Sequence, residues 1–504
     1  MKYKYGIIIL SALITIVSCK KINKKEAQVQ KPNIIIIYAD DLGIGDVSSY
    51  GSTELITPNI DRIANEGIKF TNGYATSPTC TPSRYSLLSG IYPFRKKGAQ
   101  ILPGNAPLLF DLGKQTLPSM LRDAGYFTGV IGKWHLGLGD ENLDWNGEVS
   151  PGPLEIGFDY SYVMASTNDR VPSVYVKDHS IVNLDPNDPI EVSYKKNFEG
   201  EPTGKENPEM LKLHPSHGHD MSIHNGISRI GFMRGGKKAL FIDEDMADDF
   251  LLEAKNFITD HKKESFFLFY SLHQPHVPRV PHPRFAGSSG LGARGDVILE
   301  ADWDVGQLLD HLDDLGLAEN TIVIFSSDNG PVLDDGYQDE AVTKIGKHTP
   351  SGKLRGGKYS LFDAGTHVPF MVRWKGTIAP GVSDALVCQI DFTASFAAMT
   401  KQENKTIDSE NILDALLGRS DVGRKNLVLG QNNITAFRQG DWVLIPPHKG
   451  QKIFGYVNIE SGRDSIYQLY NIKEDVAQQN NLVGQFPDKV RVMKQELNII
   501  RSKF

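Results

Sequence analysis

Two adjacent pairs of oxygen-bearing side chains, Asp40-Asp41 and Asp328-Asn329, could bind a metal ion. Three carboxylates and one amide oxygen suit a hard cation, calcium or magnesium, better than zinc. Carboxylates brought together repel one another and need a cation to stay ionised. Each pair could instead cap a following helix, since Asp and Asn are good N-caps, but capping explains one residue of each pair more readily than both. We therefore predict a calcium site, with magnesium as the second choice.

The segment 80–90, CTPSRYSLLSG, has the features of a helix that begins near a cysteine. Pro82 suits the first turn and Gly90 the end of the helix. Cys80 would then lie at the helix N-terminus, where the backbone favours an anion, with Arg84 one turn later on the same face. On the residues alone, Cys80 could be a reactive thiol of low pKa or a buried cysteine before a helix.

Four continuous apolar runs, at 34–38, 128–131, 266–270 and 321–325, are each followed at once by polar or ionisable residues. Continuous runs predict strands covered on both faces, and the helical segments between them predict a mainly parallel sheet with helices on both sides. Ligands bind at the carboxyl ends of such strands. Any one of these polar residues alone could be a solvated loop residue, but four coincidences favour one shared cleft. The residues expected there are Asp40, Asp41, Lys133, His135, His273, His276, Asp328 and Asn329.

The motif Cys-x-Pro-Ser-Arg followed by Leu-x-Ser-Gly resembles the signature of type I, formylglycine-dependent sulfatases, and the chain looks like an arylsulfatase-like bacterial carbohydrate sulfatase. Further blocks of this family are matched in order at 33–41, 132–137, 328–331 and 354–358, the last followed by Val368-Pro369. The chain departs from the family pattern at 363–365, where Glu-Gly-Gly is usual, and at His367, where Arg is often seen. The resemblance implies an α/β, alkaline-phosphatase-like fold: a mainly parallel sheet sandwiched by helices, with a smaller C-terminal α/β subdomain containing an antiparallel sheet.

The resemblance also implies a mechanism. Cys80 would be oxidised to formylglycine (3-oxoalanine) by a formylglycine-generating or anaerobic sulfatase-maturating enzyme, and its hydrate would attack sulfur with Asp328 as base. Calcium would be held by Asp40, Asp41, Cys80, Asp328 and Asn329. His276, assisted by Lys358, would protonate the leaving oxygen, and His135 would take the proton of the second hydroxyl. Arg84 and Lys133 would hold the sulfate as electrostatic stabilisers. His273 and Lys353 are the alternatives to His276 and Lys358.

Residues 32–424 are predicted to form the catalytic domain and residues 425–504 the C-terminal subdomain. Within the first, 165–236 is rich in Pro, Asn, Asp and His, which indicates an insertion that carries substrate loops. Asp169, Arg170 and His214 are candidates for sugar contacts. A zinc site of His214, His217, His219 and Asp220 is a second interpretation, which we disfavour because such motifs produce many false positives.

The first residues carry an export signal: Lys2 and Lys4, an apolar stretch, and Ile16-Val17-Ser18-Cys19, which resembles a lipobox. We expect a signal peptide at 1–18 and a tether at 19–31 lipidated on Cys19, although an ordinary signal peptide would share these features. The expected location is the periplasm or the outer membrane of a Gram-negative bacterium, with a lipid anchor. Cys19, Cys80 and Cys388 are too few for a disulfide framework, and a net charge of −7 gives no support for nucleic-acid binding.

The expected function is a sulfuric ester hydrolase that removes sulfate from a sulfated oligosaccharide or polysaccharide. Ulvan, carrageenan and glycosaminoglycans are all candidate substrates. A phosphonate or phosphate monoester hydrolase of the same superfamily is the first alternative. An inactive glycan-binding lipoprotein is the second, and the intact set of Cys80, Arg84, Lys133 and His135 argues against it.

Overall fold

The computed structural model describes residues 1 and 31–503. The predicted signal peptide and tether, with the lipidation site Cys19, lie outside the described residues except at Met1 and Lys31. In the described part of the chain, no helix combines the length and the apolar character needed to cross a bilayer.

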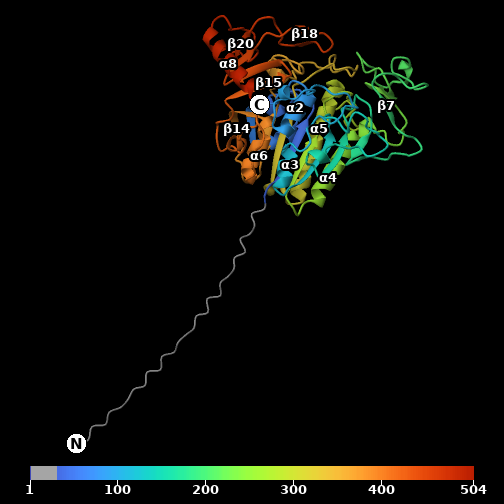
Figure 1. Cartoon of the computed structure of the whole chain (residues 1–504), viewed down its shortest axis with the longest axis horizontal. Helices are drawn as coiled ribbons and strands as arrows, with labels where there is room; N and C mark the ends of the chain where they lie inside the picture. Colours follow the sequence, from blue (N-terminus) through green and yellow to red (C-terminus); the bar gives the residue numbers. More distant parts are fainter. Residues whose placement is uncertain (2–30, 504) are drawn as a thin grey trace.

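A ten-stranded sheet forms the centre of the molecule (Figure 1). Its order is β14 (Gly381–Cys388), β2 (Ile68–Tyr74), β13 (Phe370–Arg373), β12 (Thr321–Ser327), β1 (Asn33–Ala39), β11 (Phe266–Ser271), β3 (Phe127–Lys133), β4 (Tyr160–Met164), β5 (Tyr175–Lys177) and β6 (Ser180–Ile181). The four predicted apolar runs are the adjacent strands β12, β1, β11 and β3, and all are parallel. The predicted mainly parallel sheet is therefore confirmed.

Helices cover both faces of this sheet because β1 is apolar on both sides. Ile34 and Ile36 pack in one core with α2 (Cys80–Ser89), α3 (Leu117–Asp123) and α6 (Phe392–Thr400). Ile35 and Ile37 pack in the other with α1 (Pro58–Asn65), α4 (Met246–Asp260) and α5 (Gly292–Asp314). All four isoleucines are fully buried, which contributes about 1.5–3 kcal/mol for each side chain. The short helix α7 (Leu413–Leu416) extends the first layer.

A second, antiparallel sheet lies in the C-terminal part, as predicted. It consists of β15 (Asn426–Gln431), β16 (Ile434–Gln439), β17 (Trp442–Ile445) and β20 (Gln468–Asn471), with α8 (Pro487–Ser502) packed through Met493 and Leu497. A hairpin of β18 (Ile453–Phe454) and β19 (Ile459–Glu460) projects from it. Figure 1 shows this red subdomain at one end of the molecule, with β18 extending away from α8.

The predicted insertion is only partly a separate structure. Its first strands, β5 and β6, extend the central sheet in antiparallel pairing beyond β4. The remainder forms two small antiparallel pairs, β7 (Glu191–Ser193) with β10 (Phe232–Arg234), and β8 (Ile223–His224) with β9 (Ile227–Ser228).

Candidate active site

The polar residues that follow the parallel strands converge, as the sequence predicts. Asp40 and Asp41 follow β1, Asp328 and Asn329 follow β12, and all four are fully buried. The backbone N–H of Asp41 donates to Oδ1 of Asp328 at 3.2 Å. Lys133 is the last residue of β3, two strands from β1. Neighbouring parallel strands end at the same edge of the sheet, which brings these residues together.

Cys80 is the first residue of α2, and Gly90 ends the helix with φ +66°. The thiol is buried, and its sulfur lies within 4.8 Å of carboxylate oxygens of Asp40 and Asp328. Burial raises the pKa of the Cys80 thiol, although Lys133 and Lys358 act in the opposite direction. A thiolate of low pKa, one of the interpretations open from the sequence, is therefore not what this environment favours.

Three cations lie against the carboxylates. Arg84 donates from Nε to Oδ2 of Asp328 at 2.9 Å, Lys133 bonds Asp40, and Lys358 contacts Oδ2 of Asp41 at 2.7 Å. Burial would raise the pKa of Asp328, but Arg84 and Lys133 outweigh it and lower that pKa. Burial and the charge of Asp328 hold the pKa of Asp40 well above its ordinary value. Asp328 therefore favours its ionised form, whereas Asp40 does not. A further cation bound here would stabilise the ionised form of Asp40.

Two buried oxygens of the cluster, Oδ1 of Asp40 and Oδ1 of Asn329, have no hydrogen-bond partner among the described residues. Nδ2 of Asn329 donates to Oδ1 of Asp41 at 2.7 Å, so its amide oxygen stays free. Buried polar atoms are nearly always satisfied, and an oxygen-rich donor set suits calcium. These residues therefore fit the predicted cation.

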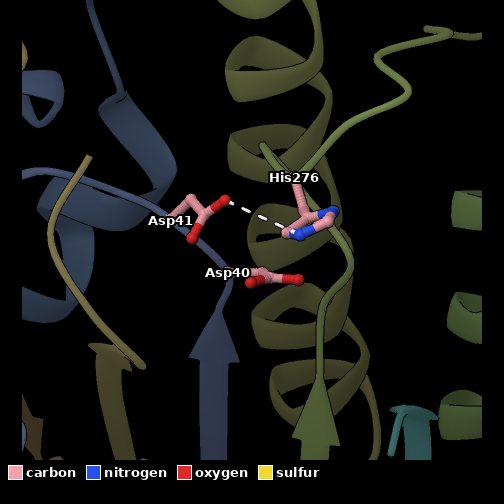
Figure 2. Close-up of side chains that lie close together, drawn as sticks. All are labelled: Asp40, Asp41 and His276. Carbon is pink, nitrogen blue, oxygen red and sulfur yellow. Dashed lines mark ion pairs between the residues drawn. The ribbon is translucent and has the colours of Figure 1, made fainter. Parts of the chain in front are cut away.

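Two histidines lie beside this cluster. Figure 2 shows the imidazole of His276, from the loop after β11, facing the carboxylate of Asp41, with Nε2 3.9 Å from Oδ2. Its Nδ1 donates to the carbonyl of Val277 at 2.7 Å, so Nε2 is the nitrogen that faces the cluster. Nε2 of His135 donates to the carbonyl of Leu102 at 3.0 Å, which leaves its buried Nδ1 without a partner. Burial and neighbouring lysines keep the pKa of both imidazoles well below the ordinary value.

The structure places the residues that the sequence left as alternatives in different surroundings. Lys358 is buried in the cluster, whereas Lys353 is exposed. His273 is buried after β11, where burial and Lys133 lower its pKa to about 3, and its ring lies against Phe250.

Of the predicted sugar contacts, Asp169 and Arg170 lie together, with Nη1 of Arg170 2.8 Å from Oδ1 of Asp169. His214 is exposed and has no side-chain hydrogen bond among the described residues. The histidine of this segment that contacts Asp169 is His219. Its Nε2 lies 3.0 Å from Oδ2 of Asp169, and its Nδ1 lies 3.0 Å from the carbonyl of His217. Both partners are oxygen acceptors, so this geometry favours the protonated form of His219, and the bond to Asp169 raises its pKa.

The zinc interpretation finds no support in this geometry. Within residues 31–503, the groups of side chains placed to hold a metal ion are those at the strand ends, and none includes His214, His217, His219 or Asp220.

Sequence reasoning missed Asp335 and Tyr359. Oδ2 of Asp335 lies 2.7 Å from Nζ of Lys358, and its Oδ1 accepts the Tyr359 hydroxyl at 3.0 Å. Tyr359 has φ +71°, a conformation that costs energy for a bulky side chain. Proximity in sequence was the available signal, since Tyr359 follows Lys358 directly and Asp335 lies in the loop after Asn329.

The two departures from the family pattern contact each other. Nδ1 of His367 lies 2.8 Å from Oδ2 of Asp363, and the Tyr74 hydroxyl bonds the other oxygen of Asp363 at 2.8 Å. These bonds connect the segment that follows Lys358 to β2.

Comparisons with known proteins agree with this geometry. The pattern of the Sulfatase family matches residues 32–401. An N-acetylgalactosamine-6-O-sulfatase of Bacteroides thetaiotaomicron is 49% identical over 502 residues, covering 98% of each chain. Arylsulfatase A of Bos taurus is 31% identical over 404 residues, covering 80% of this chain and 71% of the relative.

A solved structure from work on the metabolism of multiple glycosaminoglycans by Bacteroides thetaiotaomicron superposes with a TM-score of 0.92 at 50% identity. The match covers 94% of this chain and 100% of that one. The alkaline-phosphatase-like architecture expected from the sequence is thereby confirmed. The chain belongs to the sulfatase family, and it is a sulfuric ester hydrolase.

Proposed function

We propose that this sulfatase removes the 6-O-sulfate of N-acetylgalactosamine in a glycosaminoglycan, using a formylglycine made from Cys80 and a bound calcium ion. The observation that carries the substrate is the 49% identity, over 98% of both chains, to a sulfatase of that specificity. The Asp169–Arg170–His219 group, of which Asp169 is buried and the other two residues are partly exposed, supports it, because charged donors and acceptors held in place suit sugar hydroxyls.

The chemistry of the modified residue would be that of an aldehyde hydrate, whose hydroxyl attacks sulfur and whose second hydroxyl later expels sulfate. Asp328, whose pKa stays low, is suited to accept the first proton. Nδ1 of His135 is free to accept the second. Arg84 and Lys133 carry the charge that stabilises the sulfate oxygens.

His276 is proposed as the acid that protonates the leaving sugar oxygen through Nε2. Its lowered pKa reflects burial and the cations Lys358 and Lys133. A sulfate ester brings negative charge next to these cations, which favours the protonated imidazole. Lys358 would assist by contacting the same leaving oxygen.

Calcium would be held by Asp40, Asp41, Asp328, Asn329 and the oxygen derived from Cys80. Its contribution would be electrostatic, since a divalent cation offsets the charge that builds on the sulfate oxygens.

Release of sulfate from the 6-sulfated and 4-sulfated forms of N-acetylgalactosamine tests the proposal, with Cys80→Ala as the matched inactive control. The proposal expects turnover of the 6-sulfate, none in the control, and at least a hundredfold preference over the 4-sulfate, a discrimination of about 2.7 kcal/mol. No turnover of the 6-sulfate by fully matured enzyme would contradict it. Faster turnover of an aryl phosphate or phosphonate than of the aryl sulfate would favour the alternative hydrolase.

We also propose that the protein is exported and anchored through a lipid on Cys19, because the residues before Cys19 match a lipobox. Cys19→Ser should move the protein from the membrane fraction to the soluble periplasmic fraction. Unchanged membrane association would contradict the anchor.

A further inference from the structure

The hairpin of β18 and β19 forms one wall of a hollow through Phe454 and Tyr456. This hollow has a volume of about 180 Å³ and is lined by Thr79, Tyr359, Tyr456 and Arg463, among others. Thr79 directly precedes Cys80, and Tyr359 directly follows Lys358. Tyr456 is 48% exposed, with its ring 6.0 Å from that of Tyr359. The hollow is therefore lined in part by residues that adjoin the active site in sequence and in part by aromatic rings.

A second hollow lies on the C-terminal subdomain and has a basic lining. Its volume is about 530 Å³, and its charged lining residues are Lys449, Lys452, Arg463 and Asp464. Three cations thus face one carboxylate. Arg463 lines both hollows, so it connects the basic surface to the aromatic one.

Arg463 is held in place without a counter-ion. Its guanidinium lies 5.2 Å from the centre of the Phe454 ring, and a Cβ added at Gly450 would lie only 2.6 Å from its Nη1. Within residues 31–503, no carboxylate lies within 4.0 Å of it, whereas Lys452 is paired with Asp464 at 2.7 Å. An unpaired arginine beside aromatic rings is suited to bind a carboxylate or sulfate group on a ring-shaped ligand.

We propose that the two hollows form one subsite for the acidic sugar next to the sulfated residue. Arg463 and Lys449 bind its carboxylate or sulfate, and Tyr456 packs against its ring. The proposal rests on the proposed function, because it requires that the target sulfate belong to a chain of acidic sugars. It makes the C-terminal subdomain a determinant of chain recognition, separate from the residues that act on the sulfate ester.

The first experiment compares kcat/KM on 6-sulfated N-acetylgalactosamine with kcat/KM on a 6-sulfated oligosaccharide that contains flanking hexuronates. Arg463→Ala should lower kcat/KM on the oligosaccharide about tenfold or more, the scale of one charge-assisted contact, and leave the monosaccharide unchanged. Arg463→Lys should restore part of the loss, and added salt should shrink the difference. Lys473→Ala, which removes another exposed lysine of the subdomain, is the matched control.

Equal losses on both substrates, no loss on either, or the same loss in the Lys473→Ala control would overturn the subsite. An oligosaccharide with reduced carboxyl groups identifies the anion. If Arg463→Ala no longer lowers kcat/KM on this reduced oligosaccharide, the subsite binds the carboxylate of the hexuronate. If it still lowers kcat/KM, the subsite binds a flanking sulfate.

A second measurement does not depend on catalysis. Calorimetry of the Cys80→Ala protein with a sulfated polymer of N-acetylhexosamine and hexuronate, which carries both candidate anions, should show binding that weakens about tenfold when Arg463→Ala is added. Binding unaffected by Arg463→Ala would overturn the subsite even if the substrate proposed above proved wrong. Failure of wild-type enzyme on every 6-sulfated substrate, with this binding intact, would contradict the proposed function alone.

Discussion

Lys358 lies between two buried carboxylates, 2.7 Å from Asp41 and 2.7 Å from Asp335, while Lys353 is exposed on the same loop. Lys358→Ala should lower kcat/KM on any sulfate ester by about 10²–10³-fold, the usual cost of losing one positioned charge donor. Lys353→Ala should stay within about twofold, because no carboxylate in the described chain pairs with it. Kinetics on an aryl sulfate and on the sugar sulfate check this, and equal losses in both variants would contradict it.

His219 gives the site a pH dependence. Burial alone would lower the pKa of this imidazole, but its bond to Asp169 outweighs burial and raises the pKa above the usual value. The charged form is therefore complete at low pH and is lost as pH rises through this raised pKa. We expect KM for the sugar sulfate to rise over that interval while KM for a small aryl sulfate stays level.

His219→Gln should remove that step from the KM profile, whereas His214→Gln, at an exposed position, should retain it. A step that survives in the His219 variant would assign the titration to another group.

At this scale, the sequence predicts the residues that directly follow strands and fails for those placed by loops. Asp40, Lys133 and Asp328 were predictable because each ends a continuous apolar run. His219 was not, because the segment HPSHGHD offers several equivalent side chains and only packing brings one of them to Asp169.

A buried ion pair between Asp46 and Arg294 connects the loop between β1 and α1 to α5. Arg294 contacts both of its oxygens, at 2.7 and 2.6 Å, and His348 lies 2.7 Å from Oδ1. Asp46→Asn leaves a buried arginine uncompensated and should lower the free energy of unfolding by about 3–5 kcal/mol. Asp310→Asn, at a 59% exposed carboxylate paired with Arg62, should cost no more than about 1 kcal/mol. Denaturant unfolding of both variants is the measurement, and equal costs would refute the role of burial.

The same ion pair predicts a sign for acid denaturation. Burial would raise the pKa of Asp46, but Arg294 outweighs it and the pKa is lowered. Its stabilisation is therefore complete above the unfolded value, about 3.9, and is lost as pH falls through the lowered pKa. Wild type should lose stability over that acidic interval, and Asp46→Asn should lose less.

Within the central sheet, the parallel strands β12, β1, β11 and β3 were predictable, and the short antiparallel strands β13, β5 and β6 were not. β13 spans only Phe370–Arg373, yet it lies between β12 and β2 and reverses the sheet direction there. Four residues give too short a pattern to reveal direction, which depends on the pairing of segments far apart in sequence. β5 and β6 likewise pair with the central sheet, although they lie in the segment 165–236 that the sequence predicts to be an insertion.

At the scale of the whole molecule, the C-terminal subdomain contacts residues that flank the active site. The Ser360 hydroxyl donates to the carbonyl of Glu460 at 2.6 Å, and the Thr79 hydroxyl bonds Oε1 of Gln431 at 2.9 Å. The C-terminal subdomain was predictable as a unit from its short strands and closing helix. Its position against the residues before Cys80 and after Lys358 was not, because it depends on an apolar core that joins segments far apart in sequence, such as Leu386 and Phe437.

The central claim is that Cys80, at the start of α2 and beside Asp40 and Asp328, acts as formylglycine rather than as a thiol. Peptide mass spectrometry on preparations matured to different extents, with sulfate release measured on each, tests this claim. The account predicts that specific activity rises in proportion to the fraction of Cys80 converted to formylglycine and extrapolates to zero in unconverted protein. Full activity in protein whose Cys80 remains an unmodified cysteine would contradict it.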